Sequence, residues 1–173
     1  MTEDAAGVFD PIAIIRVLNE HRVRFVVIGG IAAGVQGAMW LTTDLDLVYA
    51  RDRQDLTHLA AALAALDAEP IGLPSGVTVK LDERSLASGS VWTLKTRFGR
   101  LDLLDEPAPG LTYTSLAASA RTIHGSATYP VASVDHLIAM NRTAGRPKDA
   151  GHLELLERVA QELRRDPPDE RGD

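Results

Sequence analysis

The chain has 173 residues, a net charge of −6 and 45% hydrophobic residues, which predicts one domain with a sizeable apolar core. It contains no cysteine, so disulfide bonds, thiolate catalysis and cysteine-based zinc sites are excluded. No apolar run approaches the ~20 residues that span a bilayer, and the acidic N-terminus lacks a signal peptide's basic region. We therefore expect a cytoplasmic protein with no membrane partner.

The acidic balance argues against a dedicated, tight nucleic-acid binder, but the charge is unevenly distributed. Residues 95–148 carry seven Lys or Arg side chains against four Asp or Glu, whereas the segments before and after are acidic. One interpretation is an ordinary solvated surface. The other is a surface that faces phosphate groups, and composition alone leaves both open.

The first half of the chain predicts alternating helices and strands after a flexible segment at 1–9. Asp10 is a typical N-cap and Pro11 a typical first helical residue, and Asp52 caps a later helix in the same way. In chain order, the predicted elements are a helix at 10–21, a strand at 25–28, a short helix at 31–37, a strand at 44–49, a helix at 52–67, a loop at 69–76 and a strand at 77–81.

The second half predicts strands followed by helices. The elements are a hairpin with strands at 91–95 and 100–104, a short helix at 113–119, a small hairpin at 122–131, a helix from Ser133 and a final helix at 148–165. Residues 166–173, with two prolines and mixed charges, are expected to form a disordered tail. Residues 10–165 are thus predicted to form a single α/β domain. Its mixed sheet is flanked by helices and has a helical C-terminal segment.

Two carboxylates share one face of the predicted strand at 44–49. Asp44 and Asp46 alternate with Leu45 and Leu47, and side chains at i and i+2 of a strand point the same way. Carboxylates held about 5–7 Å apart repel each other unless a cation lies between them. Mg²⁺ prefers such oxygen ligands, often together with substrate phosphates. Alone, however, the pattern is also common on the solvent face of a strand.

Asp102 strengthens the metal interpretation. It lies between Leu101 and Leu103 on a later predicted strand, and it completes a carboxylate cluster if the two strands are neighbours. Two-metal phosphoryl transfer uses such a cluster, with the ions about 3.5–4 Å apart. Asp105 is an alternative third carboxylate, although it falls at the end of the strand.

Two further motifs each have two interpretations. The Gly29-Gly30 pair is either an ordinary strand-to-helix turn or a place where a phosphate approaches the backbone. Arg146 and Lys148 either flank an ordinary helix start or reach nucleotide phosphates, and the sequence alone leaves this open.

Taken together, these motifs resemble the nucleotidyltransferase superfamily of the DNA polymerase β type. The resemblance narrows to small bacterial members related to abortive-infection toxins of toxin–antitoxin systems. The stretches that carry it are Gly29-Gly30, Thr42 to Arg51 with its Asp-Leu-Asp, Gly99 to Leu104 and Ala144 to Asp149.

The resemblance implies transfer of a nucleoside monophosphate from a nucleoside triphosphate to a hydroxyl acceptor, with RNA or tRNA as a candidate. It also makes a cognate antitoxin or toxin protein a candidate partner. It assigns Asp44, Asp46 and Asp102 as catalytic residues and as ligands of Mg²⁺ or Mn²⁺. The nucleotide-binding residues that it implies are Gly29, Gly30, Thr42, Thr43, Arg146 and Lys148.

The chain departs from the family pattern at three positions. Trp40 stands where relatives usually carry an arginine, Asn141 where they carry a lysine, and His152 where they carry an acid. We therefore expect reduced cationic support for the triphosphate. A second interpretation is a weakened or inactive relative that acts as a binding partner or regulator.

Overall fold

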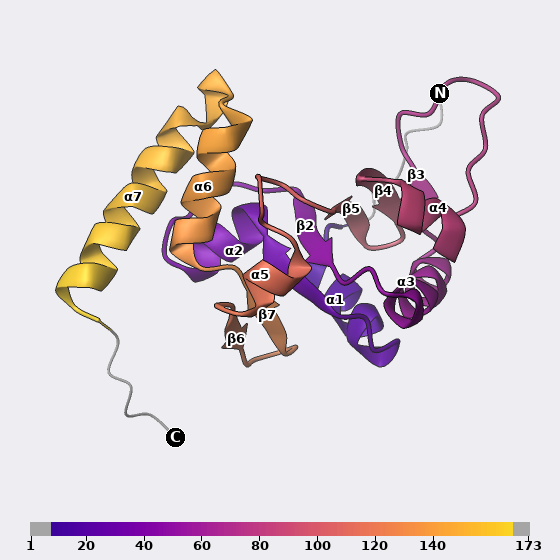
Figure 1. The fold of residues 1–173 in the computed structure, drawn as a ribbon, viewed down its shortest axis with the longest axis horizontal. Coiled ribbons are helices and arrows are strands. Elements are labelled where there is room, and N and C mark those ends of the chain that lie inside the picture. Colours follow the sequence, from indigo (N-terminus) through magenta and orange to yellow (C-terminus); the bar gives the residue numbers. More distant parts are fainter. Residues whose placement is uncertain (1–7, 168–173) are drawn as a thin grey trace.

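The computed structural model describes residues 8–167, except for the side chain of Lys148, and arranges them around a mixed seven-stranded sheet (Figure 1). The strands are β1 (Phe25–Ile28), β2 (Asp44–Tyr49), β3 (Glu69–Pro70), β4 (Val91–Thr96), β5 (Gly99–Leu104), β6 (Arg121–Ile123) and β7 (Tyr129–Val131). The helices are α1 (Pro11–Glu20), α2 (Gly29–Val35), α3 (Arg53–Ala65), α4 (Glu83–Ser88), α5 (Tyr113–Ala117), α6 (Val134–Ala144), the 3₁₀ helix η1 (Pro147–Asp149) and α7 (Ala150–Arg165). The predicted α/β class, with its helical C-terminal segment, is confirmed.

The strand order places β2 at the centre of the sheet. The strands follow one another as β3-β4-β5-β2-β1-β7-β6. β2 runs parallel to β5 and antiparallel to β1, and β4 and β5 form the predicted antiparallel hairpin. β7 is parallel to β1, and β6 pairs with β7 at the edge of the sheet. The two strands that carry the predicted carboxylates are therefore neighbours, although a long stretch of chain separates them.

Side-chain caps begin the helices that flank this sheet. The Asp10 carboxylate accepts a hydrogen bond from the Ala13 backbone N–H at 2.9 Å and starts α1. Asp52 starts α3 by accepting one from the Asp55 N–H at 3.0 Å, and Ser133 caps α6 in the same manner. These three starts agree with the sequence because a cap depends on residues within one helical turn.

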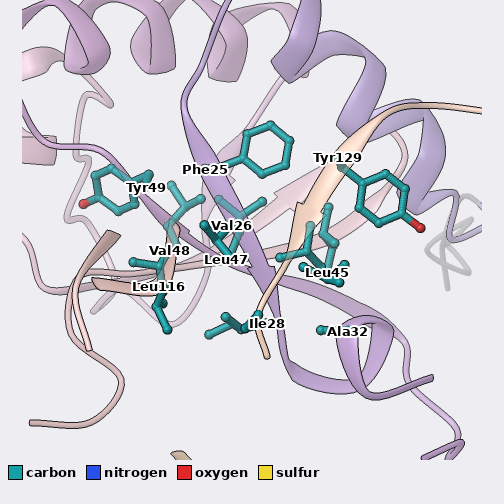
Figure 2. Close-up of a cluster of buried hydrophobic side chains, with 14 of the residues drawn as sticks. Phe25, Val26, Ile28, Ala32, Leu45, Leu47, Val48, Tyr49, Leu116 and Tyr129 are labelled. Atoms are coloured by element: carbon teal, nitrogen blue, oxygen red, sulfur yellow. The ribbon is translucent and has the colours of Figure 1, made fainter. Parts of the chain in front are cut away.

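The centre of the core lies on β1 and β2 (Figure 2). Every residue of Phe25–Ile28 is buried, as expected for a strand that is covered on both faces. In β2, Leu45, Leu47 and Tyr49 are buried on one face, and the alternating positions begin with Asp44. Because burial of the leucines decides which face meets the core, it also turns the intervening carboxylates to the opposite face.

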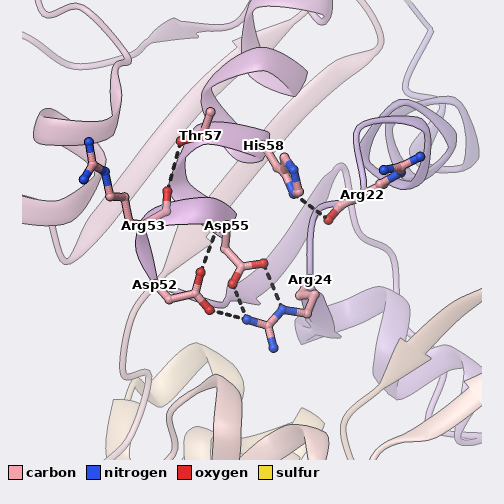
Figure 3. Close-up of polar contacts among 7 residues, drawn as sticks. All are labelled: Arg22, Arg24, Asp52, Arg53, Asp55, Thr57 and His58. Atoms are coloured by element: carbon pink, nitrogen blue, oxygen red, sulfur yellow. Dashed lines mark hydrogen bonds and ion pairs between the residues drawn. The ribbon is translucent and has the colours of Figure 1, made fainter.

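A guanidinium ties the entry of β1 to the start of α3 (Figure 3). The Arg24 Nε donates to the Asp55 carboxylate at 2.9 Å, and its Nη2 contacts both Asp55 and Asp52. The hydrogen bond to Asp55 is the main cause that raises the pKa of Arg24 above its usual value. Asp55 is buried, so its charge requires such a partner. The Asp52 carboxylate thus begins α3, and both carboxylates hold the helix beside the strand.

The predicted strand at 77–81 is wrong, because these residues form an irregular segment. The short β3, within the predicted loop at 69–76, already pairs with β4 at that edge. The segment instead faces α3 across a cavity of about 430 Å³. Helix α4 follows and is an addition to the predicted elements, although Asp82 caps it by accepting from the Ser85 N–H at 3.0 Å.

Parts of both predicted terminal segments fall outside the described residues, namely 1–7 and 168–173. At the inner end of the first segment, Phe9 packs against the core. The next backbone N–H, that of Asp10, donates to the Phe98 carbonyl at 2.9 Å. Within residues 8–167, none of the helices combines the length and the apolar character needed to cross a membrane.

Leu47→Ala tests how far the buried face of β2 supports the fold. Leu47 is 0% exposed, so its truncation should lower the free energy of unfolding by about 2–5 kcal/mol. Leu41 is 92% exposed, and the same substitution there should change it by less than about 0.5 kcal/mol. Urea unfolding of both variants measures the difference. Equal effects would contradict the packing described for this strand.

Candidate functional site

Three carboxylates converge on one face of the sheet. In the parallel register of β2 and β5, Asp46 lies directly beside Asp102, and Asp44 projects from the same face of β2. One oxygen from each of the three residues lies within 4.8 Å of the others. The alternative carboxylate, Asp105, instead forms an ion pair with Arg51 at 3.3 Å. The structure therefore brings together the carboxylate set that the sequence singled out.

Arg100 provides a positive charge beside these carboxylates. Its Nε and Nη2 each donate to the Asp102 carboxylate at 3.2 Å, and its Nε lies 3.9 Å from an oxygen of Asp44. Arg100 is absent from the residues predicted from the sequence. The sequence does indicate that Arg100 lies near the site. Arg100 lies two positions before Asp102 on a predicted strand, so the two side chains share one face.

Asp46 has the strongest electrostatic perturbation of the three carboxylates. Burial raises its pKa to about 7, and the neighbouring charges of Asp44 and Asp102 add to the increase. Arg100 and Arg146 act in the opposite direction. A divalent cation among the three carboxylates would relieve this repulsion, so the oxygen-only ligand set and its charge fit Mg²⁺ or Mn²⁺.

The Gly29-Gly30 turn is required by close packing against the site. Gly29 has a φ of +66°, and a Cβ on it would lie 2.2 Å from the Asp46 Oδ2. A Cβ on Gly30 would lie 2.7 Å from the Cβ of Thr42. Thr42 in turn donates from Oγ1 to the Asp44 carboxylate at 2.8 Å, whereas Thr43 is exposed. Both glycines and Thr42 therefore contribute to placing the carboxylates.

A cavity of about 180 Å³ opens beside Asp46, and we refer to it as the site cavity. It lies between the sheet and α6, and Arg146 borders it beyond the end of that helix. Asn141 also lines it, and the Asn141 side-chain amide donates to the Leu137 carbonyl at 3.0 Å. The departure from the family pattern at Asn141 thus lies in the cavity wall and supplies no positive charge there.

Residues at the start of α7 hold Arg146. The Asp149 carboxylate accepts a hydrogen bond from the Arg146 Nε at 2.6 Å. His152 lies one turn further along and stacks on Trp40, with ring centroids 4.0 Å apart and planes inclined by 8°. The predicted nucleotide-binding residue Lys148 lies between Arg146 and Asp149, and its side chain is outside the described residues.

Three solved structures share this arrangement of strands and helices. The lincosamide antibiotic adenylyltransferase LnuA, solved with lincomycin bound, has a TM-score of 0.57 at 13% identity and covers 88% of this chain and 99% of its own. The antibiotic-resistance factor ANT(2'')-Ia has a TM-score of 0.55 at 14% identity and covers 88% and 83%. The chain has the nucleotidyltransferase fold. A protein from Thermotoga maritima assigned as a nucleotidyltransferase also has this fold, with a TM-score of 0.51 at 16% identity over 87% and 89%.

The likeness to these solved structures is therefore one of fold. No protein-family model matches the chain, and no curated protein matches its sequence. The predicted nucleotidyltransferase-like fold is confirmed by these structures. In this chain it places the carboxylates, the site cavity and Arg146 close together.

The raised pKa of Asp46 predicts a pH-dependent stability for the metal-free nucleotidyltransferase fold. Between about pH 4 and pH 7 the unfolded chain has ionised Asp46, but the folded chain keeps its proton, so the free energy of unfolding falls as pH rises. Asp46→Asn removes this titration. Relative to that variant, the wild type should lose about 2–4 kcal/mol between pH 4 and pH 8. Urea unfolding with a chelator measures it, and a pH-independent difference would contradict the burial of Asp46.

Gly29→Ala tests the packing of the turn against Asp46. The added methyl group meets the Asp46 carboxylate and the positive φ disfavours it, so stability should fall by at least about 1 kcal/mol and Mn²⁺ binding should weaken. Gly34 is the matched control in α2, since a Cβ there meets nothing within 4 Å, and Gly34→Ala should stabilise by about 0.4–1 kcal/mol. Melting curves and Mn²⁺ titration distinguish the two. Equal changes in stability and in Mn²⁺ binding for the two variants would contradict the close packing of Gly29 against Asp46.

Proposed function

We propose that this protein is a metal-dependent nucleotidyltransferase that moves a nucleoside monophosphate from a nucleoside triphosphate to a hydroxyl acceptor. The observation that carries the proposal is the convergence of Asp44, Asp46 and Asp102 within 4.8 Å beside a cavity bordered by Arg146. A nucleotidyltransferase fold alone does not fix the chemistry. The carboxylate cluster supplies the functional argument because it fits the metal ions that such a transfer uses.

In the proposed reaction the acceptor oxygen forms a bond to the α-phosphorus, and the bond from that phosphorus to the bridging α–β oxygen breaks. Pyrophosphate leaves with the electron pair of that bond, and the proton of the acceptor hydroxyl passes to water. Mg²⁺ or Mn²⁺, when bound, would supply the charge that stabilises the attacking and leaving oxygens. Asp44, Asp46 and Asp102 would hold these ions, and the Gly29-Gly30 turn would keep the carboxylate of Asp46 in place.

Arg146 would bind the phosphates of the triphosphate. Its side chain is 62% exposed and borders the site cavity, and its charge lowers the pKa of Asp46, so it lies within electrostatic range of the carboxylates. A guanidinium suits this role because it can donate two parallel hydrogen bonds to a phosphate. Lys148 is proposed as a second phosphate ligand on the resemblance alone.

For the acceptor we propose RNA, and tRNA ends in particular, because the motifs resemble those of toxin-related nucleotidyltransferases. A cognate antitoxin would then be the protein partner. LnuA, in contrast, is a lincosamide antibiotic adenylyltransferase. Small hydroxyl-bearing molecules are therefore the second acceptor class to test. The net charge of −6 is easier to reconcile with a small acceptor than with tight RNA binding.

One observation favours a second candidate function, that of a binding partner or regulator with little transfer activity. The Asn141 amide lies in the wall of the site cavity and donates to its own helix, where a lysine would add a charge-assisted contact. Such a protein need not bind nucleoside triphosphates. Titration of each nucleoside triphosphate with and without Mg²⁺ separates the two functions.

Transfer activity should depend on the three carboxylates and not on a neighbouring one. Asp46→Asn or Asp102→Asn should lower label transfer by about 100-fold or more. Loss of a metal ligand should reduce activity at least as much as loss of a residue that hydrogen-bonds to such a ligand. Asp105→Asn is the matched control, since this carboxylate pairs with Arg51 and lies outside the cluster. The assay incubates each labelled nucleoside triphosphate with Mg²⁺ or Mn²⁺ and total RNA, total protein or a lincosamide.

The fraction that acquires label identifies the acceptor class. Retained transfer by Asp46→Asn would contradict the metal assignment. A chain that binds nucleoside triphosphates but labels none of these fractions would point to an acceptor outside them, whereas absence of nucleotide binding would support the regulator.

A further inference from the structure

Two of the three departures from the family pattern meet in the folded chain. Trp40 lies in the segment between α2 and β2, which runs beside α6 and α7 in Figure 1. Its indole stacks on the His152 imidazole in the first turn of α7, at 4.0 Å and 8°. The same segment approaches α7 again at Gly37, where an added Cβ would lie 3.8 Å from Val159. The stack therefore joins the segment that leads into Asp44 to the helix that follows Arg146.

The stack lies next to a buried charge. The His152 Nδ1 is 3.8 Å from one oxygen of Asp149, and the other oxygen of Asp149 accepts the hydrogen bond from the Arg146 Nε. Asp149 is only 8% exposed, so its carboxylate requires close partners to offset lost hydration. Trp40, His152, Asp149 and Arg146 thus form a continuous series of contacts, which we call the Trp40–Arg146 chain.

Arg146, the last residue of the Trp40–Arg146 chain, borders the site cavity. Arg146 is held through Nε, and a guanidinium held in that way keeps the N–H groups of its Nη atoms for another partner. Two parallel N–H groups are the arrangement that binds phosphate bidentately. The direction of these N–H groups depends on the position of Asp149. That position is fixed by whatever holds the N-terminal end of α7, which Asp149 directly precedes.

We propose that Trp40 and His152 are positioning residues, which fix the head of α7 and so aim Arg146 at the phosphates of the nucleoside triphosphate. The proposal rests on the proposed function for its ligand and adds to it the residues that orient the phosphate-binding group. Neither ring needs to touch the nucleotide. The stack restricts the helix because two planar rings in contact allow little movement of the backbones that carry them.

The positioning is tested first without nucleotide, through the Nε–H groups of the arginines in ¹⁵N–¹H spectra. The signal of Arg146 is identified by its loss in Arg146→Gln. In Trp40→Ala its exchange with water should accelerate about tenfold or more, the effect expected when a charge-assisted hydrogen bond is no longer held in place. The Nε–H of Arg24, which donates to Asp55 at 2.9 Å, is the internal control and should not change.

Two further variants separate stacking from simple filling of space. Trp40→Phe keeps a planar ring and should retain slow exchange of the Arg146 Nε–H. His152→Ala removes the opposite ring, which is partly exposed, and should reproduce the effect of Trp40→Ala. Melting curves confirm that each variant is folded. Unchanged exchange in both Trp40→Ala and His152→Ala would overturn the proposal.

A double-mutant cycle on nucleotide affinity completes the test. Calorimetry with each nucleoside triphosphate and Mg²⁺ should show about tenfold weaker binding for Trp40→Ala, and no further weakening when Trp40→Ala is added to Arg146→Gln. Full additivity of the two substitutions would overturn the proposal, because Trp40 would then act by another route. A different result would be accelerated exchange in Trp40→Ala although the wild type binds none of the nucleotides. That result would overturn the proposed function and would support only the positioning of Arg146 by the Trp40–Arg146 chain.

Discussion

The site depends on the parallel register between β2 and β5. A shift of one residue would turn the carboxylate of Asp46 or Asp102 to the other face of the sheet. The register is held by Leu45, Leu47, Leu101 and the other leucines that alternate with the carboxylates, all of them buried in the core. Like charges are therefore kept together by apolar packing on the opposite face, and the unfavourable electrostatics is offset by burial of the leucines.

The parts of the fold that the sequence predicted well are those decided by neighbouring residues. Asp10 and Asp52 cap their helices within one turn, and the alternation over 44–49 already separates the core face from the carboxylate face. The segment at 77–81 alternates too, but pairing at the sheet edge depends on β3, which the sequence places in a loop. Local pattern cannot decide between two segments that compete for one edge.

The same limit applies to the candidate site. The matching apolar-Asp-apolar patterns indicated the three carboxylates, and only the strand order could show that β2 and β5 are neighbours. Trp40 and His152 are separated by most of the chain, so in the sequence they read as two independent departures. In the structure they are one contact, stacked at 4.0 Å. A contact between two such departures is visible only when the fold brings the residues together.

The strand order also has a consequence for how the molecule assembles. β4 and β5 are joined by a tight turn and can pair early, whereas β2 reaches β5 only after the chain between them has closed into a large loop. Asp102 is far from Asp44 and Asp46 until that closure, so its repulsion with them opposes a late step of folding and leaves the early hairpin unaffected. Acid or a divalent cation would remove this electrostatic barrier, and the speed of folding would then report on the charge state of the site.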